Sequence, residues 1–139
     1  MKVLAVISVV LIIALGWAAC GGNKLETETL KTVETRTVGN LTIVLMNRAG
    51  DLNQGQNDFV VQFRNQHGKP VDVGNVQFGS SMSMPGMAPM SGNSEITPAK
   101  QTGTYRVKSD FAMSGAWRFT ISWNGPQGPG NTTFNLNVR

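Results

Sequence analysis

Residues 116–123 read Ala-Trp-Arg-Phe-Thr-Ile-Ser-Trp, an alternation of large apolar and polar side chains that decides the fold. Successive side chains of an extended chain point to opposite faces, so the alternation separates this segment into two faces. One face carries Trp117, Phe119, Ile121 and Trp123, and the other carries Arg118, Thr120 and Ser122. A strand with one apolar face must cover that face with a second layer. The segment therefore predicts a β-strand in a two-layer protein.

The same period of two recurs along the chain, separated by turns rich in Gly, Pro and Asn, and no helical periodicity appears. The predicted strands cover residues 41–46, 59–64, 71–80, 94–99, 104–111, 117–123 and 132–138. A slip of phase at Gly74-Asn75 indicates a bulge in the third of them. We therefore predict an all-β protein, an immunoglobulin-like antiparallel β-sandwich of about seven strands, preceded by an N-terminal signal or anchor segment.

The first 19 residues form that segment, with Lys2 ahead of a long apolar run and small residues before Cys20. This layout is typical of a secretory signal and resembles a bacterial lipoprotein signal, in which the cysteine is lipidated. Cys20 is the one cysteine of the chain and stands where lipidation requires it. An uncleaved membrane anchor and ordinary secretion with cleavage after Ala19 are the alternatives. All three interpretations export the domain to the bacterial envelope.

Residues 20–36 are polar and rich in Thr, Glu and Lys, and we expect them to form a flexible tether. Residues 37–139 then form the folded domain, which is long enough to bury one core without a disulfide. The formal net charge is +4, and its charges are scattered without a basic stripe. The sequence therefore gives no basis for nucleic-acid binding.

Residues 82–90 read Met-Ser-Met-Pro-Gly-Met-Ala-Pro-Met and hold four of the seven methionines of the chain. Thioethers are soft, uncharged ligands that suit Cu(I) and similar ions. Pro85-Gly86 predicts a turn that brings Met84 and Met87 towards each other, with Met82 and Met90 outside them. We predict a soft-metal site here. The alternative is that methionine serves as adaptable apolar filling, which caps the core or docks a partner.

Strands that alternate in direction place the loops at 47–56, 82–92 and 112–116 at one end of the sandwich. Met113 thereby becomes a candidate fifth thioether ligand, or else a residue that closes its own turn. His67 falls in a turn at the opposite end, roughly 25–30 Å away, and is therefore a poor co-ligand.

Several short motifs resemble those of the YtkA-like domain, which is related to FixH proteins and occurs in bacterial envelope proteins and beside heavy-metal efflux adaptors. They are Gly68-Lys69-Pro70-Val71, Met84-Pro85-Gly86-Met87, Gly103-Thr104-Tyr105 and Met113-Ser114-Gly115-Ala116-Trp117. The resemblance covers about residues 38–138. It implies an immunoglobulin-like sandwich, an envelope location and a link to copper or heavy-metal handling. Ala88-Pro89-Met90 stands where the family tends to carry a His, which argues against Cu(II) or Zn²⁺.

Catalytic groups are scarce, because the chain has one His, one Cys and eight scattered carboxylates. No nucleophile with a neighbouring base can be assembled from these residues, so we predict that the domain is not an enzyme. We expect a lipid-anchored envelope domain that binds Cu(I) or Ag(I) through Met82, Met84, Met87, Met90 and Met113. The expected partners are the membrane, through lipid on Cys20, and an envelope metal-transport or oxidase-assembly protein. The alternative is a metal-free interaction module that uses the same loop as an apolar docking surface.

Overall fold

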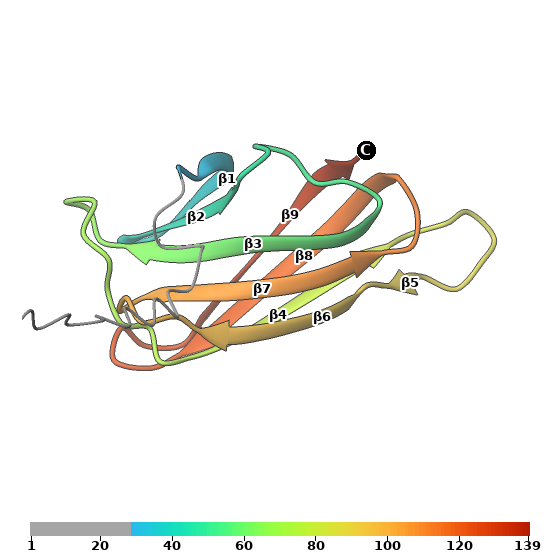
Figure 1. The fold of residues 1–139 in the computed structure, drawn as a ribbon. Helices are drawn as coiled ribbons and strands as arrows, with labels where there is room; N and C mark the ends of the chain where they lie inside the picture. Colours follow the sequence, from blue (N-terminus) through green and yellow to red (C-terminus); the bar gives the residue numbers. More distant parts are fainter. Residues whose placement is uncertain (1–28) are drawn as a thin grey trace, which may run out of the picture.

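The computed structural model describes residues 29–139, and every regular element in that range is a β-strand (Figure 1). The strands are β1 (Lys31–Val38), β2 (Leu41–Asn47), β3 (Gly55–Arg64), β4 (Asn75–Met82), β5 (Met90–Ser91), β6 (Asn93–Pro98), β7 (Thr104–Phe111), β8 (Gly115–Asn124) and β9 (Gly130–Val138). Within the described range, no helix is long and apolar enough to span a membrane.

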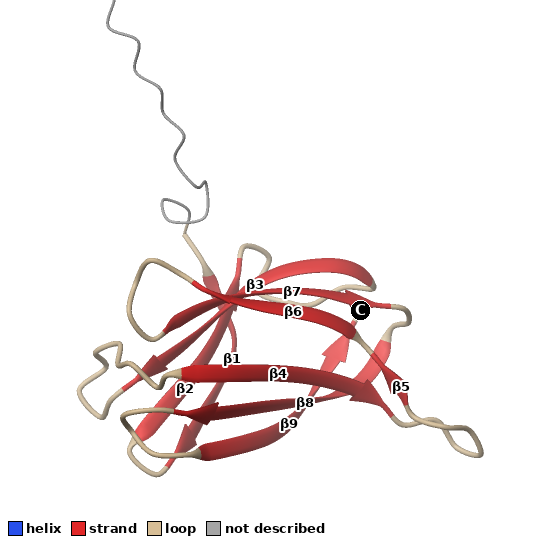
Figure 2. Ribbon diagram, turned by 90° about the horizontal axis from the view of Figure 1, so that it is seen from below, coloured by secondary structure: helices blue, strands red, loops and turns tan. Residues whose placement is uncertain are grey.

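The strands form two sheets that face each other (Figure 2). One sheet has the order β1-β2-β3-β7-β6 and the other has the order β5-β4-β8-β9, with every neighbouring pair antiparallel. Strands β2, β3, β7 and β6 follow the A-B-E-D order of an immunoglobulin domain, and β4, β8 and β9 follow its C-F-G order. The predicted immunoglobulin-like sandwich is therefore confirmed, and residues 29–139 contain both of its sheets.

Strand β1 is a correction to the predicted tether, because residues 31–36 belong to it. Its pairing with β2 runs from Lys31 opposite Asn47 to Val38 opposite Leu41. Val33 and Val38 also pack against the core. These contacts order a segment whose composition alone is that of a linker. The predicted signal segment (1–19), the lipidation site Cys20 and the tether up to residue 28 lie outside the described residues.

The third predicted strand begins later than expected, at Asn75 instead of Val71. The preceding segment is still bonded to the end of β3 in the other sheet, because the Val71 N–H donates to the Phe63 carbonyl at 3.0 Å. Gly74 then takes a left-handed conformation with φ of 75° and turns the chain into the second sheet. The predicted irregularity at Gly74-Asn75 is therefore the start of the strand.

The core lies between the two sheets and is built around β8. Trp117, Phe119 and Ile121 have no exposed surface, and Trp123 is also buried. Phe111 from β7 packs edge-on against Phe119, with ring centroids 5.6 Å apart. The predicted inward face of residues 117–123 is thus the inward face in the structure.

Between β5 and β6 the chain crosses from one sheet to the other at Gly92. The Gly92 N–H donates to the Ser80 carbonyl at 2.9 Å, which holds the crossing against β4. A methyl group on Gly92 would lie 2.3 Å from Ser80 Oγ, so glycine lets the two segments pass closely. The crossing fixes where the loop between β4 and β5 leaves the sandwich.

Candidate functional site: the methionine hairpin

The three loops predicted to share one end of the sandwich do so. Gln54 Nε2 donates to the Ala112 carbonyl at 3.0 Å, which joins the loop after β2 to the loop after β7. Met82 reaches the same region, because a methyl group on Gly115 would lie 2.6 Å from Met82 Cε. The loop between β4 and β5 extends beyond the strands at this end (Figures 1 and 2). We call this end the methionine pole.

His67 lies far from the methionine pole, in the turn that follows β3 at the opposite end of the sandwich (Figure 1). Its side chain is exposed, and its backbone N–H donates to Asn65 Oδ1 at 3.0 Å. The imidazole is therefore too distant to join a site in the methionine hairpin.

The methionine hairpin consists of residues 82–90, with β4 and β5 as its base. Met82 and Met90 are cross-strand partners in that base. At the tip, the Met87 N–H donates to the Met84 carbonyl at 3.3 Å, and Gly86 has φ of 75°. Proline at the first corner and a left-handed glycine at the second define a type II turn. The turn predicted from Pro85-Gly86 is therefore present.

The five predicted thioether ligands occupy three different environments. Met82 is 8% exposed and belongs to the core, whereas Met84 and Met90 are half-buried at its edge. Met87 at the tip is 67% exposed, and Met113 in the β7–β8 turn is 43% exposed. The hairpin thus combines exposed and half-buried methionines with one methionine that fills the core.

The register of β4 explains why Met82 points inward. It continues the inward series of Val76, Phe78 and Ser80, since alternate residues of a strand share a face. Ser80 Oγ, one step along this series, is buried without a hydrogen-bond partner among the described residues. This alternation was a signal in the sequence that Met82 differs from the rest of its cluster.

Met113 is held by its backbone instead of its side chain. Trp117 Nε1 donates to the Met113 carbonyl at 2.9 Å, which fixes the turn between β7 and β8. Met113 is nevertheless 43% exposed, so one residue both closes the turn and presents apolar surface to solvent.

The side chains of the methionine hairpin itself are uncharged. Among residues 29–139, no three His, Cys, Asp or Glu side chains come together as metal ligands. In the hairpin, thioethers are the soft donors, and no carboxylate or imidazole of residues 82–90 stands beside them for a hard divalent ion.

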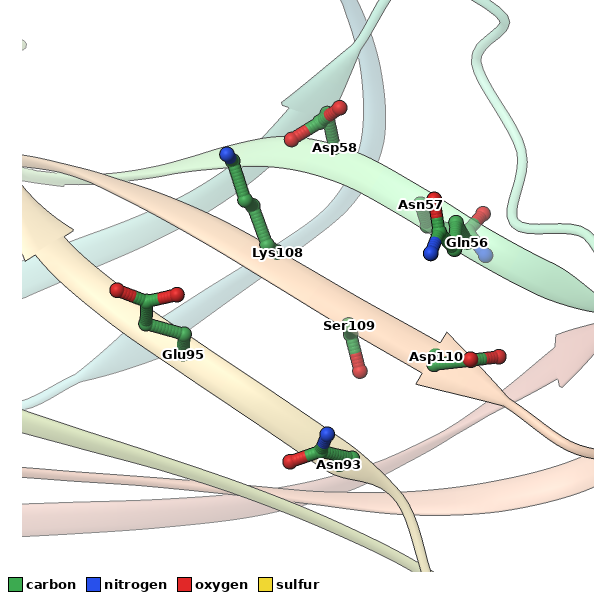
Figure 3. A pocket seen from close by; sticks show the side chains of 8 residues that line it. All are labelled: Gln56, Asn57, Asp58, Asn93, Glu95, Lys108, Ser109 and Asp110. Atoms are coloured by element: carbon green, nitrogen blue, oxygen red, sulfur yellow. The ribbon is translucent and has the colours of Figure 1, made fainter.

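A shallow polar hollow on the outer face of β3, β7 and β6 was not predicted (Figure 3). Lys108 is the cross-strand partner of Asp58 on one side and of Glu95 on the other. Asp110 occupies the next outward position, between Gln56 and Asn93. The sequence signal for this surface was the polar residue at every second position of these strands. Such positions face solvent in a sandwich, so the hollow is explained as part of the hydrated outer face of the sheet.

Comparison with known proteins identifies a family and a fold. The family model described as YtkA-like matches residues 35–122. No curated protein matches the chain.

Three solved structures illustrate the fold. A DUF4426 family protein from Pseudomonas aeruginosa PAO1 is 16% identical with a TM-score of 0.50, over 76% of this chain and 96% of that one. A copper-bound variant of FetP from uropathogenic Escherichia coli is 8% identical with a TM-score of 0.48, over 80% of this chain and 98% of that one. The Lin-41 filamin domain is 18% identical with a TM-score of 0.45, over 64% of this chain and 81% of that one. At these identities the likeness concerns the fold alone.

Proposed function

This chain belongs to the YtkA-like family, and we propose that its domain binds Cu(I) or Ag(I) through the methionine hairpin, in metal handling or delivery. The observation that carries the proposal is the pairing of the four methionines: Met84 and Met87 end one type II turn, and Met82 faces Met90 across its base. The four methionines that are close in the sequence are thus also held close together in space by the backbone of the hairpin.

The backbone spacing suits convergence of thioethers. The ends of a β-turn lie within about 7 Å of each other, and directly opposed residues of antiparallel strands lie about 4.5–5.5 Å apart, both measured between Cα atoms. Methionine side chains have three rotatable bonds and adapt to irregular geometry. Met84, Met87 and Met90 form the proposed ligand set because their side chains are at least partly exposed. Met82 would join only by leaving its contact with Gly115.

The donor set favours a soft monovalent ion. Thioethers carry no charge, so three of them leave the charge of the ion uncompensated, and this disfavours +2 relative to +1. Soft sulfur sites also avoid competition from Zn²⁺ and Ca²⁺, which prefer imidazole and oxygen ligands. The proposed ligand is therefore Cu(I), with Ag(I) as its soft analogue.

We propose a binding role without catalysis, in the bacterial envelope. A lipid on Cys20 would hold the domain at the membrane, and an envelope metal-transport or oxidase-assembly protein would receive the ion. The residues of the methionine hairpin include no titratable side chain, which supports a carrier instead of an enzyme.

The test is an anaerobic Cu(I) titration of residues 29–139 against a competing chelator. The triple variant Met84→Leu, Met87→Leu, Met90→Leu keeps the apolar volume and removes three sulfur atoms, so we expect binding to be lost. Met46→Leu is the matched control, because Met46 lies on β2 with its sulfur 3.9 Å from Arg64 Nη2, outside the hairpin. Equal affinity of the triple variant and the parent would refute the proposal.

The second candidate function is a metal-free docking module. It is favoured by the exposure of Met87 and Met113, two large hydrophobic side chains at the same pole. In this case Met87→Leu should preserve capture of the partner, Met87→Ser should abolish it, and copper should make no difference. Retained capture by Met87→Ser would exclude the hairpin from the interface.

A further inference from the structure

The described sandwich has four edge strands, and three of them are protected against pairing with another chain. Strand β6 carries Glu95 and ends at Pro98, and strand β5 has two residues. Strand β1 carries Lys31, Glu34 and Arg36, and its register shifts between Thr32 and Glu34. Charges, proline, short length and bulges are the usual means by which sheets avoid edge-to-edge association.

Strand β9 has none of these protections. Its nine residues, Gly130–Val138, include no charged residue and no proline. It pairs with β8 from Gly130 to Val138, and it ends the order of its sheet. On its other side, a bridge to Leu52 covers Val138 at the methionine pole. Among residues 29–139, the backbone groups of residues 130–137 that point away from β8 therefore have no strand paired with them.

The side chains of β9 also suit an added strand. Those on the outer face are exposed and neutral, namely Asn131, Thr133, Asn135 and Asn137. On the inner face, Thr132 and Leu136 are half-buried beside the buried Phe134. A strand placed next to β9 would bury the remaining apolar surface of Leu136, and the residues of β9 themselves bring no charge to the pairing.

We propose that this edge pairs with the β9 strand of a second copy of the chain, antiparallel about a twofold axis. An uncharged partner strand adds no charge that the pairing would have to desolvate, and among the described edges β9 is the one without charges over more than two residues. Pairing of β9 with the same strand is isologous, so it closes after two copies instead of growing into a chain. The two four-stranded sheets then become one continuous sheet of the dimer.

The test measures the mass of residues 29–139 by sedimentation equilibrium over a range of concentrations. We expect a dimer for the parent. Thr133→Lys places like charges close to each other across the twofold axis and should weaken association by about tenfold or more. Thr120→Lys is the matched control, because Thr120 is the cross-strand neighbour of Thr133 on β8 and one strand away from the edge.

A mixture of the Thr133→Lys and Thr133→Glu variants provides the second arm. Opposite charges across the axis should restore a dimer that contains one copy of each variant. Circular dichroism of every variant separates loss of association from loss of folding. The proposal would be overturned if the parent protein stayed monomeric at several hundred micromolar. This includes the case in which the monomer binds a neutral extended peptide instead of a second copy. A dimer that Thr133→Lys leaves unchanged would overturn it as well.

Discussion

Replacing Gly103 by alanine should destabilise the domain far more than replacing Gly86, although both glycines have left-handed backbones. Gly103 has φ of 68° and Gly86 has φ of 75°. An alanine in this conformation costs about 1–2 kcal/mol at either position. Gly86 is otherwise unhindered, since nothing lies within 4 Å of the added methyl group.

At Gly103 the added methyl group would lie 2.1 Å from the Val71 carbonyl oxygen. The backbone there cannot shift freely, because the Phe63 N–H donates to the Gly103 carbonyl at 2.8 Å and the Phe63 carbonyl accepts from Val71 at 3.0 Å. Overpacking of this kind costs about 1–3 kcal/mol more. We therefore expect losses of about 1–2 kcal/mol for Gly86→Ala and about 2–5 kcal/mol for Gly103→Ala.

Urea denaturation of both variants measures this difference, and the unfolded-state effect of Gly→Ala cancels between them. In a domain of this size each kcal/mol lowers the melting temperature by about 4 °C. Equal losses in the two variants, with unchanged m-values, would refute the close approach of Gly103 to Val71.

Two further predictions concern single side chains. Met82→Ala should cost about 2–4 kcal/mol of unfolding free energy because it empties a core position, whereas Met87→Ala should cost less than about 0.5 kcal/mol, both measured by thermal denaturation. Tyr105→Phe removes the hydrogen bond from Tyr105 Oη to the Gly74 carbonyl, 2.7 Å long, and should cost about 0.5–1.5 kcal/mol. Burial, and then the negative charge of Asp72, raise the pKa of Tyr105 above its ordinary value of 10.0, so stability should be full below pH 10 and decline as the pH rises further. This decline should be smaller in Tyr105→Phe, as pH-dependent urea denaturation can measure.

The fold was predictable because the strong signals are local. The period of two in residues 117–123 predicted an inward face that the structure confirms, and all seven predicted strands are present. Strand β1 was missed because an edge strand needs one partner and little apolar surface, so its Thr, Glu and Lys residues read as a linker. Its order comes from pairing with β2, which no local pattern reports.

The place of the candidate site in the fold was predictable, but the different environments of its methionines were not. The turn at Pro85-Gly86 follows from the conformational limits of these two residues. Which sulfur atoms are accessible depends on the strand register, which places Met82 in the core and leaves Met87 outside. A count of methionines treats the two residues as equal. Val76 and Phe78 point inward, and continuing their alternation along the strand to Met82 would have predicted that Met82 is buried.

The crossing of the chain at Gly92 makes the two sides of the sandwich different, with a closed side and an open side. On the closed side, β5 and β6 form one continuous stretch of backbone that is shared between the two sheets. On the open side, β1 and β9 lie in different sheets, and the Arg36 guanidinium lies 5.6 Å from the centre of the Phe134 ring. Local opening of the domain should therefore begin between β1 and β9, so that solvent reaches Phe134. The two sheets should stay together on the opposite side, where the chain crosses at Gly92 beside the methionine hairpin.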